Sequence, residues 1–359
     1  DRVMIEGRNF AYAEGLDAFA ETLAQDFPTE REGLRHYANI MGEIGKHLHD
    51  AILPRDEISF FNTSLFSQSA YEFLNNTFQD QLLINVLCGS SLKMELDKDT
   101  LPLYTFAQGN NSFIESSWRL KGDGSMLVDS LINDIRSMGG EMICNAEVEE
   151  LIEQDGRIVA AQTVNGDRYE ADWFISDTHP AITVDLVKQS SKIKKVFRRR
   201  IHSLTNTYGM YTVSLIIKPE TLKYFNWNQY IYKKPNVWTY YLDNEPVSGI
   251  LVCCRVPEDG SSYTRYVDIV TPMPWEKVAQ WTDTTVGQRG EAYRAFKDQK
   301  ADECIALAET FIPGLRDMIE ARFSSTPLTY RDYTGTPDGS AYGVRKDWQS
   351  PMMTLLTPK

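Results

Sequence analysis

The stretch that decides the fold is residues 122–180, which read GDGSMLVDSLINDIRSMGGEMICNAEVEELIEQDGRIVAAQTVNGDRYEADWFISDTHP. In its first part, Leu127, Leu131 and Ile135 recur at the spacing of one helix face. Gly139-Gly140 follows them, and glycine is the residue that most often ends a helix. The pattern therefore predicts a helix from residue 124 to residue 138.

The remainder of this stretch has the alternating period of β-structure. Asp155-Gly156 and Asn165-Gly166 are dipeptides typical of tight hairpin turns, and they separate the alternating runs. The predicted strands are 141–153, 158–164 and 169–176, and the last of them ends at Asp177-Thr178-His179-Pro180. The stretch thus predicts one helix followed by three strands.

Before this stretch the sequence predicts helices. Thr29 with Glu32, and Ser69 with Glu72, have the spacing of capping boxes. Apolar residues follow each pair and predict helices over 29–49 and from 69 to a stop at Gly89. The same part of the chain is rich in aromatic residues, which either pack a core or line a long apolar tunnel: Phe60, Phe61, Phe66, Tyr71, Phe73, Tyr104, Phe106, Phe113 and Trp118.

After residue 205 the period changes to two, which indicates a second, largely antiparallel sheet. Tyr211, Val213, Leu215 and Ile217 share one face of the first strand in this region. Further strands are predicted over 237–242, 250–256 and 266–270. Beyond them we expect a helix over 290–311, a short helix that ends at Phe323, and a loop over 330–343.

The composition is that of an ordinary globular protein of about two domains. Of the 359 residues, 42% are hydrophobic and 24% are charged, and the formal net charge of −13 disfavours a general nucleic-acid binder. The five cysteines are scattered without a CxxC spacing, so we predict buried, reduced thiols and no metal site. No apolar run is long enough to span a membrane. We expect a cytoplasmic protein with peripheral membrane association.

One short segment is strongly basic against this acidic background. Such a run is either a solvated helix face or a contact surface for anionic lipid headgroups. It comprises Lys192, Lys194, Lys195, Arg198, Arg199 and Arg200.

At residues 122–180 the sequence resembles the FAD-dependent phytoene desaturase, carotenoid isomerase and retinol saturase family. The matching pattern is the glycine-led helix, the GG pair, a strand with N-x-x-V, a hairpin, and a closing A-D-x-x-I-S strand. Three further stretches resemble this family, and together they extend the resemblance over nearly all of the chain: FPTEREGLRHY at 27–37, RGEAYRAFKDQKADECIALAETFIPGL at 289–315, and STPLTYRDYTGTPDGSAYGV at 325–344. The GTPDGSAYG form is most similar to the retinol saturase-like members.

The resemblance implies a mixed α/β (α+β) fold, in which a partial FAD/NAD(P)-binding Rossmann-like domain joins a substrate domain built on a largely antiparallel sheet plus helices. It assigns residues 1–115 and 181–322 to the substrate domain, and residues 116–180 and 323–359 to the FAD-binding domain. The family begins with a strand and a G-x-G-x-x-G turn that holds the pyrophosphate at a helix N-terminus. These residues contain no such motif, so we expect this chain to lack the pyrophosphate-binding segment and the C-terminal flavin segment.

The resemblance also implies the candidate site. Glu147 and Val148 are expected beside the adenine end of FAD. Thr178 and His179 follow a strand end, where ligands gather in α/β sheets. The last group is expected near the isoalloxazine ring, because glycine permits a close backbone approach: Gly339, Ser340, Tyr342 and Gly343. NAD(P) is the expected electron partner, and no catalytic side chain is assigned because the flavin supplies the redox chemistry.

Three functions follow from these expectations. The first is an FAD-dependent oxidoreductase that desaturates, saturates or isomerises C–C bonds of an apolar polyene or isoprenoid-like substrate. The second is a flavin amine oxidase, whose aromatic cage would use Tyr330, Tyr333 and Tyr342. The third is a non-catalytic lipid-binding or membrane-docking protein. For the first, the substrate tunnel is expected between residues 1–115 and the sheet at 205–275.

Overall fold

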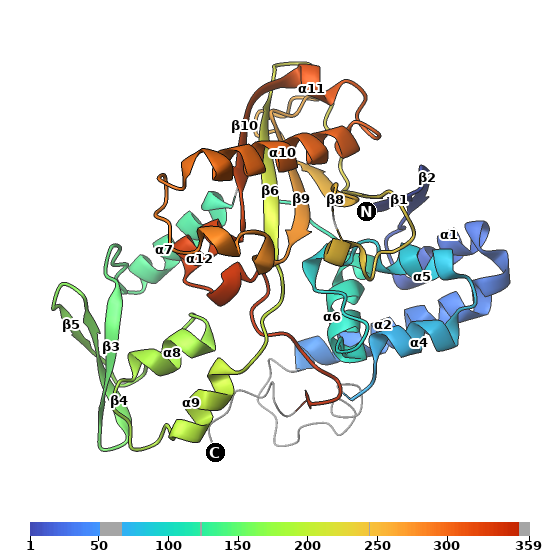
Figure 1. The fold of residues 1–359 in the computed structure, drawn as a ribbon. Coiled ribbons are helices and arrows are strands. Elements are labelled where there is room, and N and C mark those ends of the chain that lie inside the picture. Colours follow the sequence, from blue (N-terminus) through green and yellow to red (C-terminus); the bar gives the residue numbers. More distant parts are fainter. Residues whose placement is uncertain (51–66, 123, 244, 352–359) are drawn as a thin grey trace.

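The structure is a computed structural model that describes residues 1–50, 67–122, 124–243 and 245–351, the side chains of 46–50 excepted. It confirms a mixed α/β fold with a largely antiparallel sheet. A seven-stranded sheet with the order β10-β6-β9-β8-β7-β1-β2 forms its centre, and a separate three-stranded sheet has the order β3-β4-β5 (Figure 1). In the described ranges no helix is both long enough and apolar enough to cross a bilayer.

The large sheet is antiparallel except for one parallel pair, β1 with β7. Its strands are β1 (Arg2–Ile5), β2 (Arg8–Ala11), β6 (Gly209–Ile217), β7 (Gln229–Tyr232), β8 (Gly249–Cys254), β9 (Tyr266–Met273) and β10 (Ile319–Ser325). The period-two prediction for β6 is confirmed, since Tyr211, Val213, Leu215 and Ile217 are all buried. Strands β1, β2 and β7 are too short to show a clear period, and the sequence prediction missed them.

One face of the sheet is covered by helix α10 (Gly290–Ala308), which packs on β8, β9 and β10 (Figure 1). This helix was predicted. The short helix expected to end at Phe323 was wrong, because α11 spans only Leu315–Met318 and β10 begins at Ile319. Pairing with the edge of β6 satisfies the backbone of this segment, and that long-range gain outweighs local helix propensity.

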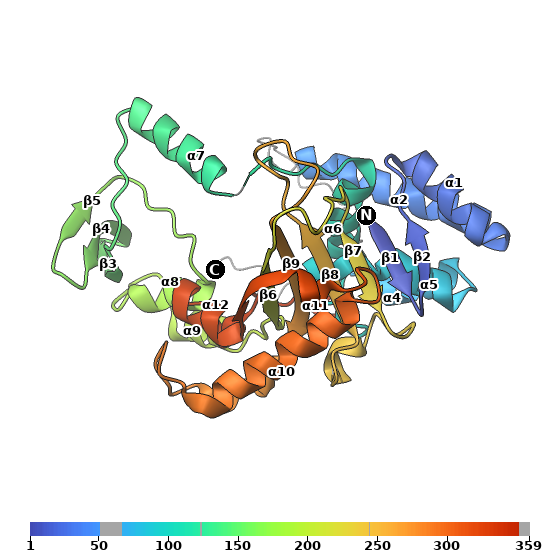
Figure 2. The same cartoon turned by 90° about the horizontal axis from the view of Figure 1, so that it is seen from above.

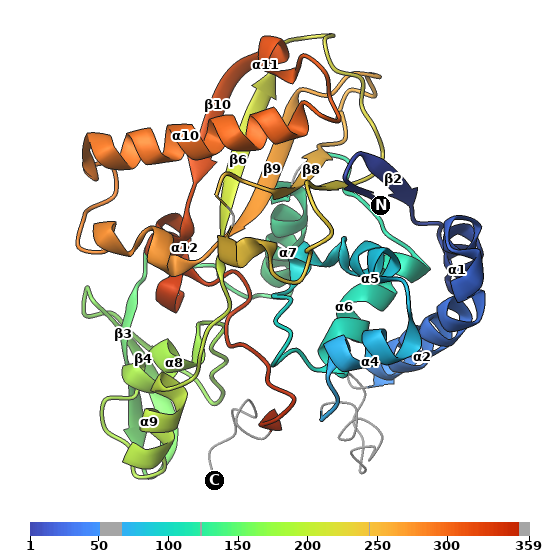
Figure 3. The same ribbon diagram turned by 45° about the vertical axis from the view of Figure 1, so that its right-hand side comes forward.

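The described residues within 16–115 form a helical lobe beside β1 and β2 (Figure 3). Its helices are α1 (Leu16–Asp26), the 3-10 turn η1 (Pro28–Glu30), α2 (Arg31–Asp50), α4 (Ala70–Thr77), α5 (Gln81–Cys88), the 3-10 turn η2 (Ser91–Lys93) and α6 (Leu103–Glu115). The cap at Ser69 is confirmed, since its side chain accepts from the amide of Glu72 at 3.2 Å. The predicted helix from 69 to 88 is two helices, because Asp80 caps a new one through the amides of Leu82 and Leu83.

The capping box predicted at Thr29 and Glu32 does not form. Residues 28–30 make a 3-10 turn without a side-chain cap, and α2 begins only at Arg31. The adjacent carboxylate, Glu30, is buried and accepts from the amides of Gln79 and Asp80 at 2.8 and 2.7 Å. Glu30 therefore joins the turn before α2 to the start of α5.

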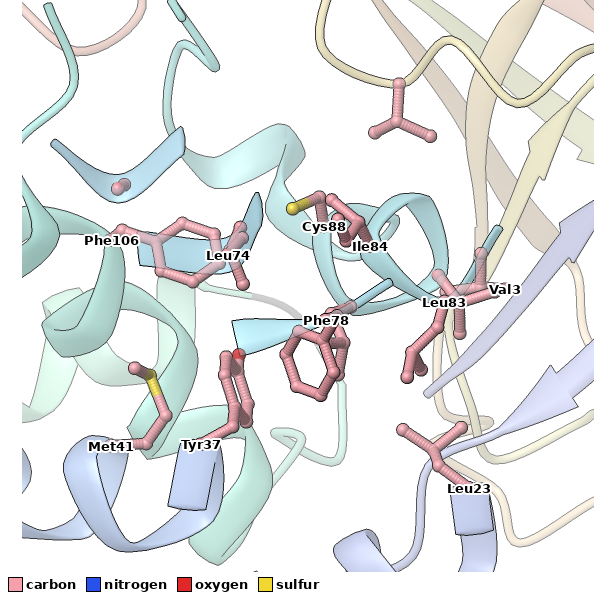
Figure 4. Close-up of a cluster of buried hydrophobic side chains, with 14 of the residues drawn as sticks. Val3, Leu23, Tyr37, Met41, Leu74, Phe78, Leu83, Ile84, Cys88 and Phe106 are labelled. Carbon is pink, nitrogen blue, oxygen red and sulfur yellow. The ribbon is translucent and has the colours of Figure 1, made fainter. Parts of the chain in front are cut away.

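The core of the helical lobe is continuous with the sheet. Figure 4 shows Tyr37 of α2, Leu74 of α4 and Phe106 of α6 in one cluster with Phe78, which follows the end of α4. Val3 and Ile5 join this cluster, whereas Met4 lies between them in sequence and joins the cluster under α10. Side chains of a strand alternate between its faces, so β1 contributes to both cores.

The described aromatic residues of the expected tunnel are mostly core residues. Tyr71 and Phe106 contact the indole of Trp238, with ring centroids 5.2 and 6.4 Å apart. Trp118 is 90% exposed. The remaining members of that prediction, Phe60, Phe61 and Phe66, lie outside the described residues.

The stretch 122–180 forms helix α7 (Ser125–Ser137) and the small sheet of β3 (Val148–Gln154), β4 (Arg157–Thr163) and β5 (Arg168–Glu170). Figure 2 shows this unit standing apart from the large sheet. The helix, its glycine stop and both turns are confirmed, but residues 141–147 and 171–176 are not in strands. Those two ends have no neighbouring strand to pair with among the described residues. Helix α7 has no buried residue, and its apolar stripe is exposed.

Two further predictions were wrong. Residues 237–242 do not form a strand, since the 3-10 helix η3 spans Tyr240–Asp243. The apolar period there reflects packing of Val237, Trp238 and Tyr240 into the helical-lobe core. The loop expected over 330–343 contains most of helix α12 (Pro327–Thr334) and the 3-10 turn η6 (Pro337–Gly339), because Thr326 caps α12 through the amide of Leu328. Shorter 3-10 turns are η4 (Trp275–Lys277) and η5 (Ala279–Trp281).

Candidate functional site

An open cleft of about 480 Å³ lies between two segments that are far apart in the sequence. One wall is residues 177–180, which lead into helix α8 (Pro180–Leu186). The other wall is formed within residues 336–346, after helix α12. Five residues predicted from the sequence line this cleft: Thr178, His179, Ser340, Tyr342 and Gly343.

The other three predicted residues do not line the cleft. Val148 is the first residue of β3 and lies opposite Thr163, and the carbonyl of Glu147 accepts from the amide of Val164 at 2.9 Å. Gly339 lies behind the cleft wall. A Cβ atom at this residue would stand 2.0 Å from the carbonyl oxygen of Pro327, so only glycine fits there.

His179 is held at both ring nitrogens. Its Nδ1 accepts from the amide of Ala181 at 3.2 Å, which makes it the N-cap of α8. The Nε2 atom lies 2.9 Å from Oδ1 of Asn206. Because Nδ1 accepts, the neutral ring carries its proton on Nε2 and donates it to Asn206. His179 is therefore first a structural residue, and it presents the edge of a fixed ring to the cleft.

Thr178 lines the same wall, and its hydroxyl group belongs to a cluster of three. Oγ1 of Thr178 lies 3.1 Å from Oγ of Ser176 and 2.9 Å from Oγ1 of Thr183. Ser176 and Thr183 are themselves 2.7 Å apart. The side chain of Thr178 is exposed, so its hydroxyl keeps hydrogen-bonding capacity for a polar group in the cleft.

The second wall is fixed by the segment before β6. The buried hydroxyl of Ser340 lies 2.7 Å from that of Thr207 and donates to the carbonyl of Gly343 at 3.1 Å. The Thr207 hydroxyl also accepts from the amide of Tyr342 at 3.2 Å. Backbone hydrogen bonds connect Thr207 with Gly343 at 2.9 Å and Ala341 with Tyr208 at 3.0 Å. This wall is consequently a rigid strand-like pair and not a free loop.

Asn206 joins the two walls, and the sequence analysis missed it. Its side chain holds His179, while its backbone forms a β-bridge with Val344. Nothing in the local sequence indicates this role, since the residue stands in the irregular segment before β6. The partners of Asn206 lie 27 and 138 positions away in the chain and become neighbours only through the fold.

A smaller cavity of about 150 Å³ shares Tyr342, Val344 and Lys346 with the cleft. Its polar feature is Glu95, which is 5% exposed and pairs with the guanidinium of Arg345 at 2.6 Å. Burial raises the pKa of the Glu95 carboxyl, and the charge of Arg345 opposes this shift. The phenol of Tyr342 donates to the carbonyl of Leu92, and burial raises its pKa. The helical lobe is thereby fastened to the cleft.

Lys93 lies in the wall of this small cavity. Its Nζ atom is buried over the ring of Phe113, 3.7 Å from the ring centroid, and has no hydrogen-bond partner among the described residues. Burial lowers the pKa of this ammonium group to about 7. A cation–π contact thus replaces solvent for this charge.

The cleft is suited to a bound organic group and not to a metal. Among the described residues, no group of three or more His, Cys, Asp or Glu side chains could hold a metal ion. The volume of the cleft, about 480 Å³, falls within the range of about 300–1,000 Å³ that is usual for ligand sites. Gly343 has φ +67°, and a Cβ atom there would meet nothing within 4 Å. The backbone of the second wall can therefore approach a planar ligand closely.

The fold recurs in solved structures. An oxidoreductase from Methanosarcina mazei matches with a TM-score of 0.51 and 15% identity, over 72% of this chain and 56% of that protein. A protein from Pyrococcus furiosus matches with a TM-score of 0.52 and 14% identity, over 90% of this chain and 66% of that one. At these identities the likeness shows a shared fold.

In sequence the chain is similar to two named proteins. Prolycopene isomerase 2 and prolycopene isomerase 1, both chloroplastic and from an Oncidium hybrid cultivar, are each 21% identical to it over 356 residues. The match covers 91% of this chain and 57% of each relative, so the chain spans little more than half the length of the curated relatives it matches. No protein-family model matches the chain.

Proposed function

We propose that this chain forms the substrate-side half of a flavin-dependent oxidoreductase that acts on an apolar, carotenoid-like polyene. The observation that carries the proposal is the shared cleft, where Thr178 and His179 meet Ser340, Tyr342 and Gly343. These two groups are separated by about 160 residues of sequence, and the sequence analysis predicts both as cofactor-binding, the first from its place after a strand end and the second from the resemblance to flavoproteins. The similarity to prolycopene isomerases supports the same class.

In the proposed site, a bound flavin supplies hydride transfer to or from a C–C bond. The residues of this chain contribute binding, orientation and exclusion of water. Gly343 gives the ring close access to the backbone, and the hydroxyl of Thr178, held by Ser176 and Thr183, offers a hydrogen bond to a polar part of the cofactor. Asn206 joins the two walls, and the hydrogen bond between Ser340 and Thr207 keeps the second wall in shape.

The substrate is proposed on the names of the sequence relatives. Among desaturation, saturation and isomerisation, the name of the sequence relatives favours isomerisation. A polyene is expected to enter between the helical lobe and residues 342–346, where the small cavity begins. NAD(P) as electron partner stays a prediction.

The test is flavin binding by the gene product that carries these residues, compared between two glycine variants. Gly343 lies in the cleft, and Gly260 lies in a distant loop. Both have positive φ, at +67° and +75°, and both have open space where a Cβ atom would stand. We expect Gly343→Val to lower flavin affinity by about tenfold or more, and Gly260→Val to leave it unchanged. Equal flavin affinity in the two variants, measured by fluorescence titration, contradicts the proposed cleft.

The amine oxidase alternative has less support. Its aromatic cage would need Tyr330, Tyr333 and Tyr342 around one flavin face, yet only Tyr342 lines the cleft. Tyr333 lines a different pocket, beside the start of α10. Flavin bleaching by primary amines but not by polyenes under anaerobic conditions would reverse this order. A gene product that neither carries nor takes up flavin would favour the non-catalytic lipid-binding alternative.

A further inference from the structure

The basic run at residues 192–200 includes most of helix α9 (Lys195–His202). Some of its cations pack inside the protein, and the others point outward. Arg198 points inward, where its guanidinium donates to the carbonyls of Val184 and Val187 and fastens α9 to α8. Arg200 is half-buried and lies over the ring of Phe197, 5.1 Å from the centroid. These two arginines therefore serve the packing of α8 and α9.

The other cations of the run point outward. Lys194, Lys195 and Arg199 are exposed, and within the described ranges no carboxylate lies within 4.0 Å of their charged groups. Nearby carboxylates contact other residues, Glu150 the ammonium of Lys188 at 3.3 Å and Asp185 the ring of His202 at 2.8 Å. Lys192 is different again, since its side chain lies along the turn at Gly156 and its charge acts on Glu153.

An apolar side chain stands among these outward cations. Val196 is 75% exposed and lies one helical turn before Arg199. We call Lys194, Lys195, Val196 and Arg199 the α9 basic face. Its cations stand out in a chain with a formal net charge of −13, which makes general attraction to anions weak elsewhere.

We propose that the α9 basic face docks on bilayers that contain anionic phospholipids, with Val196 entering the headgroup layer. The cations complement the negative surface potential of such a bilayer, and attraction of this kind falls off within about one Debye length, ~10 Å. Phosphates of a nucleic acid would attract the same cations but offer no place for an exposed valine. Helix α8 begins at the cleft residue Pro180 and packs against α9 (Figure 1). Docking through α9 therefore brings the cleft close to the membrane surface.

The experiment compares two variants that lose the same charge. Lys194→Gln/Lys195→Gln/Arg199→Gln removes the cations of the α9 basic face. Lys223→Gln/Lys233→Gln/Lys234→Gln removes three exposed cations elsewhere. The whole gene product is sedimented with vesicles of phosphatidylcholine, with and without phosphatidylserine, at low and high salt. We expect the first triple to reduce binding to the anionic vesicles by about tenfold or more and the second to have little effect.

A third variant tests the apolar contact. Val196→Ser keeps every charge, and because the side chain is exposed we expect the melting temperature to stay unchanged while vesicle binding weakens severalfold. Equal loss in the two triples, absence of binding to anionic vesicles, or tighter binding to an oligonucleotide than to vesicles would each overturn the proposal. Flavin content is measured on the same samples, so a failure of docking is distinguished from a failure of the proposed function.

Discussion

At the residue scale, the two glycines of the G-S-x-Y-G stretch have different roles that their sequence context does not separate. Gly339 is required by packing, because a Cβ atom would collide with the backbone of Pro327. Gly343 is required only by its backbone conformation and by the cleft, since the space beside it is open. The resemblance placed both glycines against the cofactor, and the geometry places only Gly343 on the cleft surface.

This difference predicts two different stability losses. Gly339→Ala combines a positive φ of +57° with a backbone collision at 2.0 Å, so we expect a loss of more than about 3 kcal/mol in the free energy of unfolding. Gly343→Ala carries only the cost of positive φ, about 1–2 kcal/mol. Urea unfolding of both variants measures the difference. Equal losses would show that Gly339 is not packed against Pro327.

The ion pair behind the cleft predicts a pH dependence. Arg345→Met leaves the buried Glu95 carboxylate without its guanidinium partner, which costs about 3–5 kcal/mol for a buried pair. Burial already raises the folded-state pKa of Glu95, and losing Arg345 raises it further. A raised carboxyl pKa means that the folded state holds the proton more tightly than the unfolded state, so stability falls as pH rises above the ordinary carboxyl pKa.

We therefore expect the Arg345→Met deficit to be largest at neutral pH and to shrink as the pH approaches 4.5, the ordinary pKa of this carboxyl. Thermal unfolding across that pH range measures the trend. Glu95→Gln/Arg345→Met is the control, because it removes the charge that needs a partner. Its stability should depend less on pH than that of Arg345→Met, and a deficit independent of pH in the single variant would exclude Glu95 as the cause.

Much of the site could not be predicted from the sequence at this scale. Thr178, His179 and the 340–343 segment were found because they follow recognisable stretches of a family pattern. Asn206, Thr207 and Glu95 were missed, because each acts through partners far away in the chain. Glu95 and Arg345, for example, are 250 positions apart. No local period or motif records such a contact.

At the element scale, local signals succeeded where the hydrogen bonds they imply are local. The Ser69 cap and the glycine stop after α7 depend on residues within one turn, and both formed. The capping box predicted at Thr29 and Glu32 did not form, because residues 28–30 make a 3-10 turn and α2 begins only at Arg31. Strand β10 was missed because its partner β6 lies about 100 residues earlier in the chain. Strand β7 and β1 were missed for the same reason, since each is short and depends on the other.

The cap that forms at Asp80 and the cap that does not form at Thr29 predict different effects on stability. Asp80→Ala removes an acceptor from the amides of Leu82 and Leu83, so we expect a loss of about 0.5–2 kcal/mol. Thr29→Ala removes an exposed side chain without a cap bond and should change stability by less than about 0.5 kcal/mol. Chemical denaturation of both variants compares them. A larger loss for Thr29→Ala would restore the capping box that the sequence indicated.

At the scale of the whole molecule, the two large buried cores lie in the seven-stranded sheet and the helical lobe. Residues 122–180, the stretch with the clearest sequence pattern, bury few side chains. Helix α7 carries a regular apolar stripe, yet its members Leu127, Leu131 and Ile135 are 53%, 54% and 36% exposed. Its period correctly predicted a helix, but a period states only that one face is apolar and does not say what covers it. If the proposed function holds, we expect a dinucleotide-binding unit to cover this face.

This arrangement makes the effect of the stripe depend on its cover. In the described chain, Leu127→Gln/Leu131→Gln/Ile135→Gln replaces exposed side chains, so we expect little change in melting temperature and less self-association. Leu307→Gln in α10, which is 3% exposed, should instead cost more than about 3 kcal/mol. In a gene product that carries flavin, the triple variant should also release the cofactor more readily, because the covering unit loses its apolar contact. Unchanged flavin retention in the triple variant would mean that α7 faces solvent in the whole protein, and the cofactor would then be held by the cleft walls without help from this helix.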